Sequence, residues 1–498
     1  MFPVVQKAIA SSRHRKLFDL FPRSNYRGHI DAVRDGQVLG WAQDGSQPRR
    51  RLVVEIYAGG VLLGTVRANR IRQDLVAGGI GDGKSAFSFA LPSPAPDRAT
   101  LAARVARTHY WLVDEGGAGK SGDHGLVETI SPDWSHAIAD ATAFRREQQA
   151  LAHTWTFLGL AADVQKDGDW FRASLATRDV FVQRFGNELR GFENICPHRS
   201  YPLRQDDRGN GSVVCGFHHW QFNRDGLAIG IPHCRQLYGK LPHELGARLA
   251  PIEVATCGAL VFGRFPSEHT KESLQDFLAE GFPILEALSR MTEKPQIVVE
   301  TINANWKLYV HIALDDYHPP TLHSATVRSE GELHDPREIT YRQFGAHSCF
   351  LQTSDTKAFD RMVAGCQDGS YGASHYSIFQ IFPNLVVSLF CSDGDNWYCC
   401  LQHFIPQAHD RSLLRAFVYP SPLSAYRSRH ARRVRLLTDP IRKRLVVRSF
   451  CRVSREDRDA CERLQEAHRI GTLPRLGGLE RRIAWFEKAY RDAMNAGC

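Results

Sequence analysis

The 498-residue sequence lacks a long hydrophobic run. No apolar stretch approaches the about 18 residues that a membrane-spanning helix requires. Met1–Arg23 is a basic amphipathic segment with neither the hydrophobic core nor the cleavage site of a secretion signal. We therefore expect a soluble, cytoplasmic protein without a membrane span.

The sequence also lacks the cysteine spacing of a disulfide framework. Its 12 cysteines are scattered singles such as Cys257 and Cys366, apart from the adjacent pair Cys399-Cys400. Disulfides belong to oxidising compartments, whereas cytosolic thiols stay reduced. This pattern favours a reducing compartment, in which thiols remain available to bind metal.

A nucleic-acid recognition motif is missing as well, although the net charge is +9. Arg427–Arg452 carries a dense run of Arg and Lys interleaved with Leu and Val. Such a run is usually the solvated face of a helix. A second interpretation is a docking surface for an acidic electron-transfer partner, because complementary charges raise encounter rates. No aromatic and basic platform accompanies the run, so we expect no nucleic-acid partner.

Two cysteines and two histidines form a Cys-x-His…Cys-x-x-His pattern at Cys196, His198, Cys215 and His218. Two thiolates and two imidazoles in this order suit a [2Fe–2S] cluster in which one iron takes both Cys and the other takes both His, the Rieske arrangement. Zinc uses the same ligand types, but zinc fingers usually group a Cys pair and then a His pair. Here each loop supplies one of each, which favours the cluster.

The segments around these ligands predict an antiparallel β domain. Trp170–Ala173, Asp179–Phe185 and Leu189–Ile195 are short, rich in apolar and aromatic residues, and separated by turn signals. Together with the loops Phe192–Arg199 and Cys215–Gly226, they resemble the Rieske domain of the ring-hydroxylating oxygenase α subunits.

Two loop residues depart from that family, because Ser200 and His219 stand where it usually has glycine. His219 thereby becomes a rival of His218 as a ligand. Only His218 keeps the two-residue gap from Cys215, so we expect His218 to bind the cluster.

A second metal motif follows in Asp315-x-x-His318-x4-His323. Two His and one carboxylate make the facial triad of non-haem Fe(II) oxygenases, which leaves coordination positions open. On a straight helix His318 and His323 would point about 140° apart. Pro319 and Pro320 remove backbone donors, so we expect a kink or bulge where the metal needs convergence. Two such histidines on their own would be interpreted as residues that cap or line the end of a helix. The cluster motif upstream favours metal binding instead.

The same segment resembles the iron-binding helix of that oxygenase family, with His311-Ile312 in place of the usual Glu-Asn. The family's Glu-Asp-x4-Glu-x-x-Gln helix is matched by Arg455–Gln465, which implies Asp457 as the third ligand. Glu456 and Asp459 remain alternatives for that ligand. The alternative to metal binding is that these residues form the exposed, charged face of a helix.

The resemblance, which covers roughly residues 150–498, implies a Rieske mono- or dioxygenase that inserts oxygen from O₂ into an organic substrate, with an aromatic substrate favoured. It implies electrons from NAD(P)H through a separate reductase, directly or through a ferredoxin. Family members form homotrimers in which the cluster of one subunit faces the mononuclear Fe(II) of the next, so Asp315 is implied to bridge His218 of one subunit to His318 of its neighbour. Two alternatives stay open: a Rieske monooxygenase or demethylase for a non-aromatic or glycan-related substrate, and an electron-transfer iron–sulfur protein.

Residues before about 140 lie outside the oxygenase pattern. Alternation in Leu52–Tyr57, Val61–Val66 and Ala86–Leu91 predicts a small β-sandwich, with one helical insertion at Asn69–Ala77. The Gly40-Trp41-Ala42 and Arg72-x-Asp74-Leu75 motifs resemble a module that bacteria append to glycosyltransferases and other surface-polysaccharide proteins. That resemblance implies a glycan-related partner.

We therefore predict an α+β chain whose catalytic domain is a helix-grip (START-like) fold with a curved antiparallel sheet. The expected order is an N-terminal lead (1–24), a β-sandwich module (25–112), a linker (113–140), an antiparallel Rieske [2Fe–2S] domain (141–265) and the mononuclear iron domain (266–498).

Overall fold

The computed structural model describes residues 26–496 with internal gaps. The residues left out within this range are 60, 107, 109, 115–137, 139, 269–270, 292–293, 324–325, 327–338, 373–374, 394–395, 421–428 and 469–473. The expected N-terminal lead and residues 115–137 of the expected linker lie outside the described residues. The chain divides into two compact units, residues 1–123 with 327–335, and residues 124–326 with 336–498.

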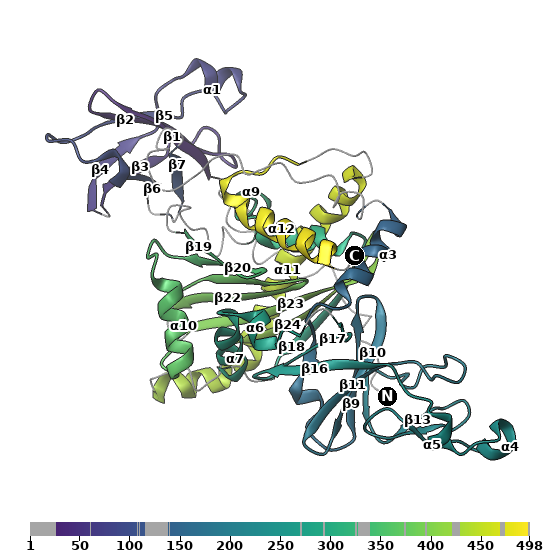
Figure 1. Cartoon of the computed structure of the whole chain (residues 1–498). Coiled ribbons are helices and arrows are strands. Elements are labelled where there is room, and N and C mark those ends of the chain that lie inside the picture. Colours follow the sequence, from purple (N-terminus) through teal and green to yellow (C-terminus); the bar gives the residue numbers. More distant parts are fainter. Residues whose placement is uncertain are drawn as a thin grey trace, which may run out of the picture. The chain divides into compact units, whose positions relative to one another are not determined.

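The first unit is built on a 7-stranded sheet in the order β4-β3-β6-β7-β1-β2-β5 (Figure 1). Its core joins Ile30 and Phe87 from one half of the sheet to Val54 and Leu101 from the other. The sheet therefore folds over one shared core, as expected of a β-sandwich. The elements are β1 (Tyr26–Arg34), β2 (Gln37–Asp44), β3 (Val53–Ala58), β4 (Val61–Arg67), α1 (Gln73–Ala77), β5 (Ala86–Ala90), β6 (Leu101–Val105) and β7 (Trp111–Asp114).

The helical insertion of this unit is shorter than predicted from Asn69–Ala77. Arg70 exchanges two backbone hydrogen bonds with Ala86, at 2.9 and 3.0 Å, and so stays extended until α1 begins at Gln73. The motif residue Arg72 forms ion pairs with Asp31 on β1 and Asp74 on α1. These contacts hold α1 to the sheet, which gives the motif a structural role within the module.

The second unit contains two further 7-stranded sheets, both antiparallel. One has the order β12-β9-β10-β11-β16-β17-β8, and we call it the cluster-loop sheet (Figure 1, lower right). A 3-stranded sheet, β13-β14-β15, extends from it. The predicted strands of this region are confirmed. The elements are β8 (Thr156–Leu160), β9 (Asp169–Leu175), β10 (Arg178–Phe185), β11 (Glu188–Glu193), β12 (Arg208–Asn210), β13 (Val213–Val214), β14 (Gln221–Phe222), β15 (Ala228–Gly230), α4 (Cys234–Tyr238), α5 (Pro242–Leu245), β16 (Pro251–Cys257) and β17 (Leu260–Arg264).

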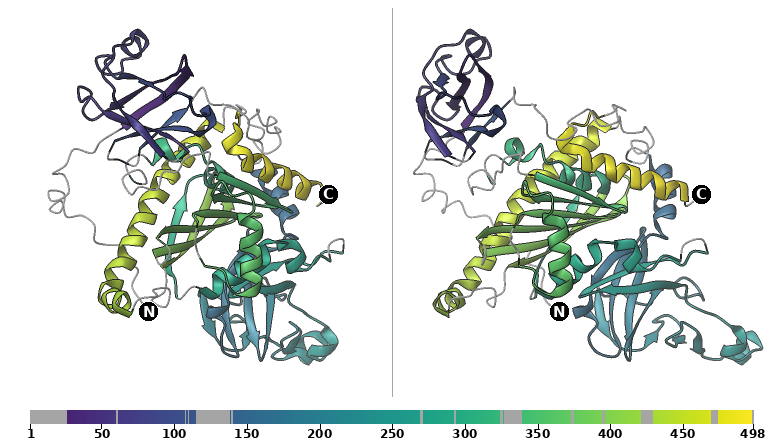
Figure 2. Two further views of the ribbon diagram at one scale, coloured as in Figure 1. Left: turned by 90° about the vertical axis from the view of Figure 1, so that its left-hand side faces the viewer. Right: turned by 60° about the vertical axis from the view of Figure 1, so that its left-hand side comes forward.

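The other sheet, which we call the C-terminal sheet, has the order β18-β24-β23-β22-β21-β20-β19. Helices cover both of its faces, and the long helix α11 crosses one of them (Figure 2). This is the predicted curved sheet gripped by helices. The elements are α3 (Ala141–Leu151), α6 (Leu274–Leu278), α7 (Gly281–Met291), β18 (Gln296–Ile302), α8 (Trp306–Leu314), α9 (Pro319–Leu322), β19 (Ile339–Phe344), β20 (His347–Gln352), α10 (Ala358–Asp368), β21 (Ser377–Ile381), β22 (Leu385–Asp393), β23 (Asn396–Ala408), β24 (Arg411–Pro420), α11 (Arg429–His468) and α12 (Arg481–Ala496).

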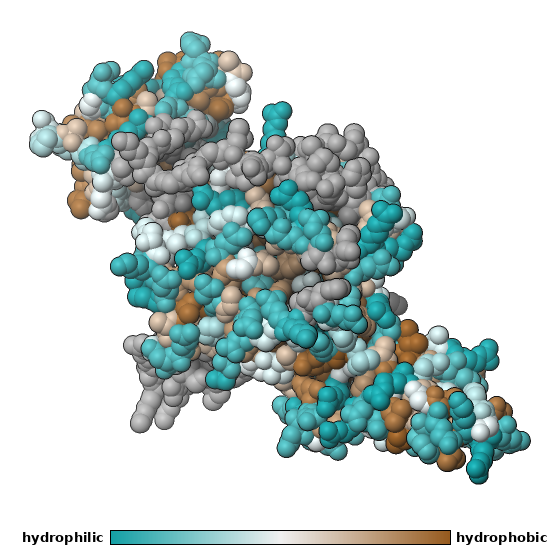
Figure 3. All heavy atoms as spheres, viewed as in Figure 1, coloured by the Kyte–Doolittle hydropathy of each residue, from teal (hydrophilic) through white to brown (hydrophobic). Residues whose placement is uncertain are grey.

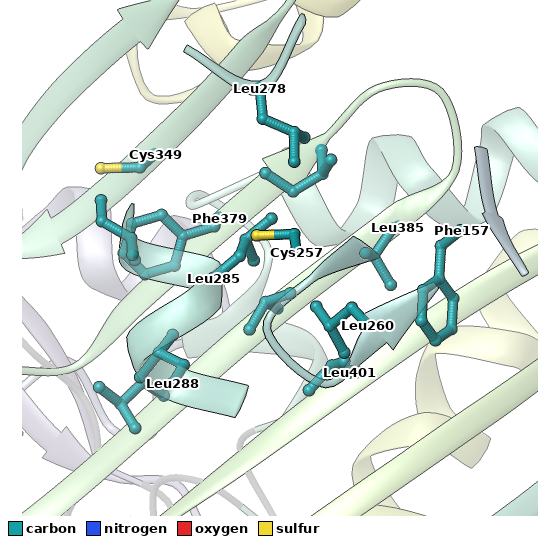
Figure 4. Packing of buried hydrophobic residues seen from close by; sticks show 14 of the residues in the cluster. Phe157, Cys257, Leu260, Leu278, Leu285, Leu288, Cys349, Phe379, Leu385 and Leu401 are labelled. Carbon is teal, nitrogen blue, oxygen red and sulfur yellow. The ribbon is translucent and has the colours of Figure 1, made fainter. Parts of the chain in front are cut away.

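Alternate residues of the C-terminal sheet enter two separate cores, because successive strand side chains point to opposite faces. Cys399 and Leu401 pack with α6, α7 and α10, and Figure 4 shows Leu401 beside Leu260 of the cluster-loop sheet. Cys400 faces the other way and packs with α8, α11 and α12. The adjacent pair Cys399-Cys400 therefore serves two cores, and neither cysteine forms a disulfide with another described residue.

The helix that carries the histidine motif breaks completely, which corrects the predicted kink. α8 ends at Leu314, Asp315 takes an extended conformation with φ −87° and ψ 105°, and α9 begins at Pro319. Prolines at the first turn of a helix lose no hydrogen bond, because those N–H groups have no partner within the helix. The two prolines therefore start a new helix instead of bending an old one.

Apolar and polar residues share the viewed surface of the second unit (Figure 3). Phe217, on the loop between β13 and β14, and Leu237, in α4, are 50% and 66% exposed. The basic run lies largely in α11, where Arg444, Arg448 and Arg452 are exposed. Across the described part of the chain, the helices are too short or too polar to cross a membrane.

Candidate metal sites

Two loops at one end of the cluster-loop sheet bring together Cys196, His198, Cys215 and His218. The first loop follows β11 and the second connects β13 to β14. Both cysteines are 1% exposed, and the rings of His198 and His218 lie with centroids 4.6 Å apart. The predicted residues thus converge from two loops, each supplying one thiol and one imidazole.

The loops have matching turns, which explains the glycine positions of the family. Ser200 N donates to Cys196 O at 2.9 Å, and His219 N donates to Cys215 O at 3.0 Å. Ser200 and His219 both have φ 56°, in the left-handed region that favours glycine. His219 is exposed, whereas His218 packs against His198. The geometry therefore favours His218 over its rival.

The chemistry of the donors suits a [2Fe–2S] cluster. Burial lowers the pKa of His198, which keeps its imidazole neutral, as a ligand must be. Burial and the neighbouring Cys215 raise the pKa of Cys196 to about 11, so only a bound cation would favour two adjacent thiolates here. His218 Nδ1 is buried without a hydrogen-bond partner among the described residues. A buried imidazole nitrogen without a hydrogen-bond partner, beside a second imidazole and two thiols, suits a metal ligand.

A second group of ligands forms where α9 meets α11. His318, His323 and Asp457 each offer one atom, and these atoms lie within 4.8 Å of one another. His318 Nε2 is 3.1 Å from His323 Nε2, and Asp457 Oδ1 is 3.0 Å from His323 Nε2 and 3.6 Å from His318 Nε2. His318 is the N-cap and His323 the C-cap of the short helix α9, so the two imidazoles come from its two ends.

The donor set at this second site suits a divalent cation. Asp457 Oδ1 is buried and makes no hydrogen bond of acceptable geometry with the described residues. Burial raises the pKa of Asp457, but His318 and His323 outweigh burial and lower it. Burial lowers the pKa of His318, but Asp315 and Asp457 raise it to about 9. A cation held between this carboxylate and the two rings would compensate its buried charge. Two His and one carboxylate are also the ligands of non-haem Fe(II) oxygenases.

Asp315 does not point at the ligand atoms. Its Oδ1 accepts hydrogen bonds from the backbone N of Tyr317 at 2.7 Å and of His318 at 3.1 Å, and its backbone O lies 2.8 Å from His318 Nδ1. Asp315 therefore shapes the turn that carries His318. Its Oδ2 lies 3.6 Å from His318 Nδ1, and its side chain is 20% exposed.

The two alternatives to Asp457 lie away from the ligand atoms. Glu456 Oε2 is 2.7 Å from His323 Nδ1, the far nitrogen of that ring. The side chain of Asp459 is 55% exposed and lies beside Arg458. Asp457 is the one carboxylate of the three that the structure brings to both histidines.

Two residues of the Arg455–Gln465 motif have positions that sequence reasoning missed. Glu462 Oε1 accepts hydrogen bonds from N and Nδ2 of Asn303, at 3.0 and 3.1 Å. Gln465 Oε1 accepts from Asn305 N at 2.8 Å, and Asn305 is the N-cap of α8. The motif therefore ties α11 to the start of the helix that leads to the histidines. In the sequence, the only signal of these contacts is the spacing of Glu462 and Gln465 within the motif.

The C-terminal helix α12 holds α8 through buried polar contacts. His311, which departs from the family's usual residue, has its Nε2 2.7 Å from Glu487 Oε1. The substituted residue thus has a carboxylate partner on α12. Arg482, 0% exposed, binds Asp316 at 2.8 Å. These contacts hold the last turn of α8 and the residue after Asp315 to α12. No local sequence pattern predicts them.

Known proteins resemble this chain over the same regions. Residues 154–247 match the family "Rieske [2Fe-2S] domain", and residues 287–496 match "Ring hydroxylating alpha subunit (catalytic domain)". The terminal oxygenase α subunit of terephthalate 1,2-dioxygenase from Comamonas sp. is 31% identical over 216 residues, covering 40% of this chain and 50% of that protein. The chain spans about half the length of the curated relatives it matches.

Two solved structures share the fold. Naphthalene 1,2-dioxygenase from Rhodococcus sp. has a TM-score of 0.57 at 19% identity, covering 73% of this chain and 94% of that chain. A quaternary ammonium Rieske monooxygenase has a TM-score of 0.57 at 16% identity, covering 74% of this chain and 95% of that chain. At identities of 16% and 19%, the likeness to these two structures shows the fold alone.

Proposed function

The chain belongs to the Rieske non-haem iron oxygenase α subunits, and from this membership we propose that it is the oxygenase component of a multicomponent system. It inserts oxygen from O₂ into an organic substrate. The observation that carries the proposal is that one chain holds two groups of candidate metal ligands. Two Cys and two His lie on the loops after β11 and between β13 and β14, and two His and one Asp lie where α9 meets α11.

We propose that Cys196, His198, Cys215 and His218 hold the [2Fe–2S] cluster. His318, His323 and Asp457 hold the mononuclear iron, in support of which their ligand atoms converge within 4.8 Å. The chemistry that these groups supply when bound is single-electron transfer and the activation of O₂ beside the substrate. The division into a module (25–112), a Rieske domain (141–265) and an iron domain (266–498) follows from the same proposal.

The chain's own residues orient these sites and link them. Asp315 holds the turn of His318 through two backbone N–H groups, and its carboxylate keeps a partly exposed oxygen beside His318 Nδ1. We propose that in a homotrimer this carboxylate receives His218 of a neighbouring copy and couples the two metals. In support, Tyr317 next to it is 69% exposed, so a second copy can approach.

An aromatic compound is the substrate that we favour. The relatives named above act on terephthalate and naphthalene, and aromatic side chains follow one another across the C-terminal sheet. Ring centroids lie 5.4 Å apart between Phe350 and Tyr376, 4.9 Å between Tyr376 and Phe390, and 4.3 Å between Phe390 and Tyr398. The runner-up is monooxygenation of a non-aromatic substrate, which the fold of the quaternary ammonium monooxygenase supports.

The electron donor is a separate NAD(P)H-dependent reductase, directly or through a ferredoxin. The exposed Arg444, Arg448 and Arg452 of α11 offer a surface of complementary charge for an acidic donor protein. The cysteines of the described residues form no disulfides with one another, which supports a cytoplasmic location. The first unit supplies none of the proposed ligands, and we assign it to a glycan-related partner.

The test is reconstitution with a reductase, NADH and ¹⁸O₂ across a panel of aromatic acids and hydrocarbons, followed by product mass. We expect label in the product and about three iron atoms per chain, two in the cluster and one in the second site. About two iron atoms with a normal cluster spectrum and no product from the whole panel would favour the electron-transfer alternative.

A further inference from the structure

Both nitrogens of His323 face carboxylates that come from consecutive residues of α11. Glu456 Oε2 lies 2.7 Å from His323 Nδ1, and Asp457 Oδ1 lies 3.0 Å from His323 Nε2. His323 is 4% exposed, so water does not compete for either nitrogen. The dipeptide Glu456-Asp457 therefore holds one imidazole by its two opposite edges.

The Glu456 oxygen is itself fixed by a third residue. Thr326 Oγ1 donates to Glu456 Oε2 at 2.7 Å, and Thr326 is 8% exposed. A carboxylate oxygen accepts and does not donate when ionised, so the proton between Glu456 and His323 belongs to Nδ1. The Nε2 atom then carries the lone pair, and it points toward Asp457 and His318.

The other histidine is held in a different way. His318 Nδ1 lies 2.8 Å from the backbone O of Asp315 and 3.6 Å from Oδ2 of the same residue. A charged acceptor on the remote nitrogen raises the basicity of an imidazole ligand more than a neutral carbonyl does, and such partners commonly tune metal affinity. The two histidines therefore differ in how closely a carboxylate approaches Nδ1: Glu456 Oε2 lies 2.7 Å from His323 Nδ1, whereas Asp315 Oδ2 lies 3.6 Å from His318 Nδ1.

We propose that Glu456 is a positioning residue that, together with Thr326, sets the tautomer and orientation of His323 and thereby the affinity of the site for its metal. This inference rests on the proposed iron site. Direct ligation by Glu456 disagrees with the geometry, because Oε2 sits at the nitrogen that faces away from Asp457 and His318.

The test measures metal affinity directly. Full-length protein with an intact cluster is stripped of its mononuclear iron, and Co(II) is titrated in against a chelator of known affinity. Glu456→Ala should bind Co(II) about 10–100-fold more weakly than the wild type. Glu456→Gln should recover part of the loss, because its carbonyl oxygen still accepts from Nδ1 without the charge. Thr326→Val, which leaves the carboxylate in place, should weaken binding by about 2–10-fold.

Asp459→Asn is the matched control, because Asp459 lies on the same helix with a side chain that is 55% exposed. It should leave Co(II) affinity and the cluster absorption at wild-type values. If Glu456→Ala fails to fold, as read from the cluster absorption, Glu456→Gln and Thr326→Val carry the test.

Two outcomes overturn the inference, and a third separates it from failure of the site. Wild-type affinity in Glu456→Ala would mean that the contact is only structural. A complete loss in both Glu456→Ala and Glu456→Gln, equal to that of Asp457→Ala, would make Glu456 a ligand. Unchanged Co(II) binding in Asp457→Ala would instead contradict the proposed iron site itself.

Discussion

A buried charge pair anchors α8, the helix that leads to the proposed iron ligands. Lys307 and Glu147 are 0% and 1% exposed and form an ion pair. Glu147 also accepts from Trp306 Nε1 at 2.8 Å and from Tyr490 OH at 2.7 Å. A third neutral donor is Gln148 Nε2, at 3.0 Å. One carboxylate of α3 thus joins α8 to α12, and Lys307→Met would leave it buried with three neutral donors and no counter-charge.

The size of the effect follows from desolvation. Removing one partner of a buried ion pair costs about 3–5 kcal/mol, because the other charge stays uncompensated. At about 2–4 °C per kcal/mol for a domain of about 200 residues, the thermal midpoint should fall by about 6–20 °C. The double variant Lys307→Met with Glu147→Gln removes both charges, so we expect it to recover most of that loss.

The assay is thermal unfolding of the C-terminal sheet followed by near-UV circular dichroism, with the cluster absorption followed in parallel. Glu147→Gln alone completes the cycle and gives the coupling between the two residues. A midpoint for Lys307→Met within about 2 °C of the wild type would refute the reasoning, because it would mean that Glu147 takes up a proton at little cost or reaches water.

The remaining predictions concern the metal sites and one buried histidine. Cys196→Ser should abolish the visible absorption of the cluster, because serine supplies no thiolate; retention of the spectrum would reassign the ligand. Asp457→Ala should remove oxygenation and leave that spectrum intact, and full activity with normal iron content would place the third ligand elsewhere. Asp315→Asn should keep both metals but slow cluster reoxidation in rapid mixing with substrate and O₂, whereas a normal rate would exclude coupling through Asp315. His347 accepts from Phe382 N at 3.0 Å and faces Phe277 O at 2.7 Å, and burial lowers its pKa to about 4. Its contribution to stability is therefore present above about pH 6.5 and is lost as the pH falls toward 4, by up to about 3 kcal/mol; an unfolding series from pH 7 to 4.5 that is equally steep in wild type and His347→Gln would contradict this.

The cluster ligands could be predicted from sequence because they are local. Cys196 and His198 share one turn, Cys215 and His218 share another, and the strands beside them alternate clearly. The helix break between α8 and α9 was only half foreseen. The rotation per residue of an α-helix predicts that His318 and His323 would point apart on a straight helix. It cannot distinguish a bend from a complete break, because that depends on the hydrogen bonds that the Asp315 carboxylate accepts.

The contacts that position the iron ligands could not be predicted, because they join residues far apart in the chain. Glu456 meets His323 across 133 positions, and His311 meets Glu487 across 176. Nothing near His311 signals a carboxylate on α12, and an acidic residue next to Asp457 is ordinary on an exposed helix. Such partners are decided by tertiary packing, so a sequence reading could offer Glu456 only as a rival ligand.

One helix nevertheless explains why the motif around Asp457 has the spacing it has. Glu462 and Gln465 bind Asn303 and Asn305 at the start of α8, whereas Glu456 binds His323 after its end. From Glu456 to Gln465 α11 rises about 13 Å, and the 9 residues of α8 rise by about the same length. Tyr309, in the middle of α8, donates from its OH to Ser454 O on α11 at 2.8 Å, so the two helices run antiparallel from the start of α8 onward. A single residue inserted between Asp457 and Glu462 would rotate the carboxylate by about 100° relative to these anchors, so the ligand and the residues that hold its helix must keep their distance along the chain.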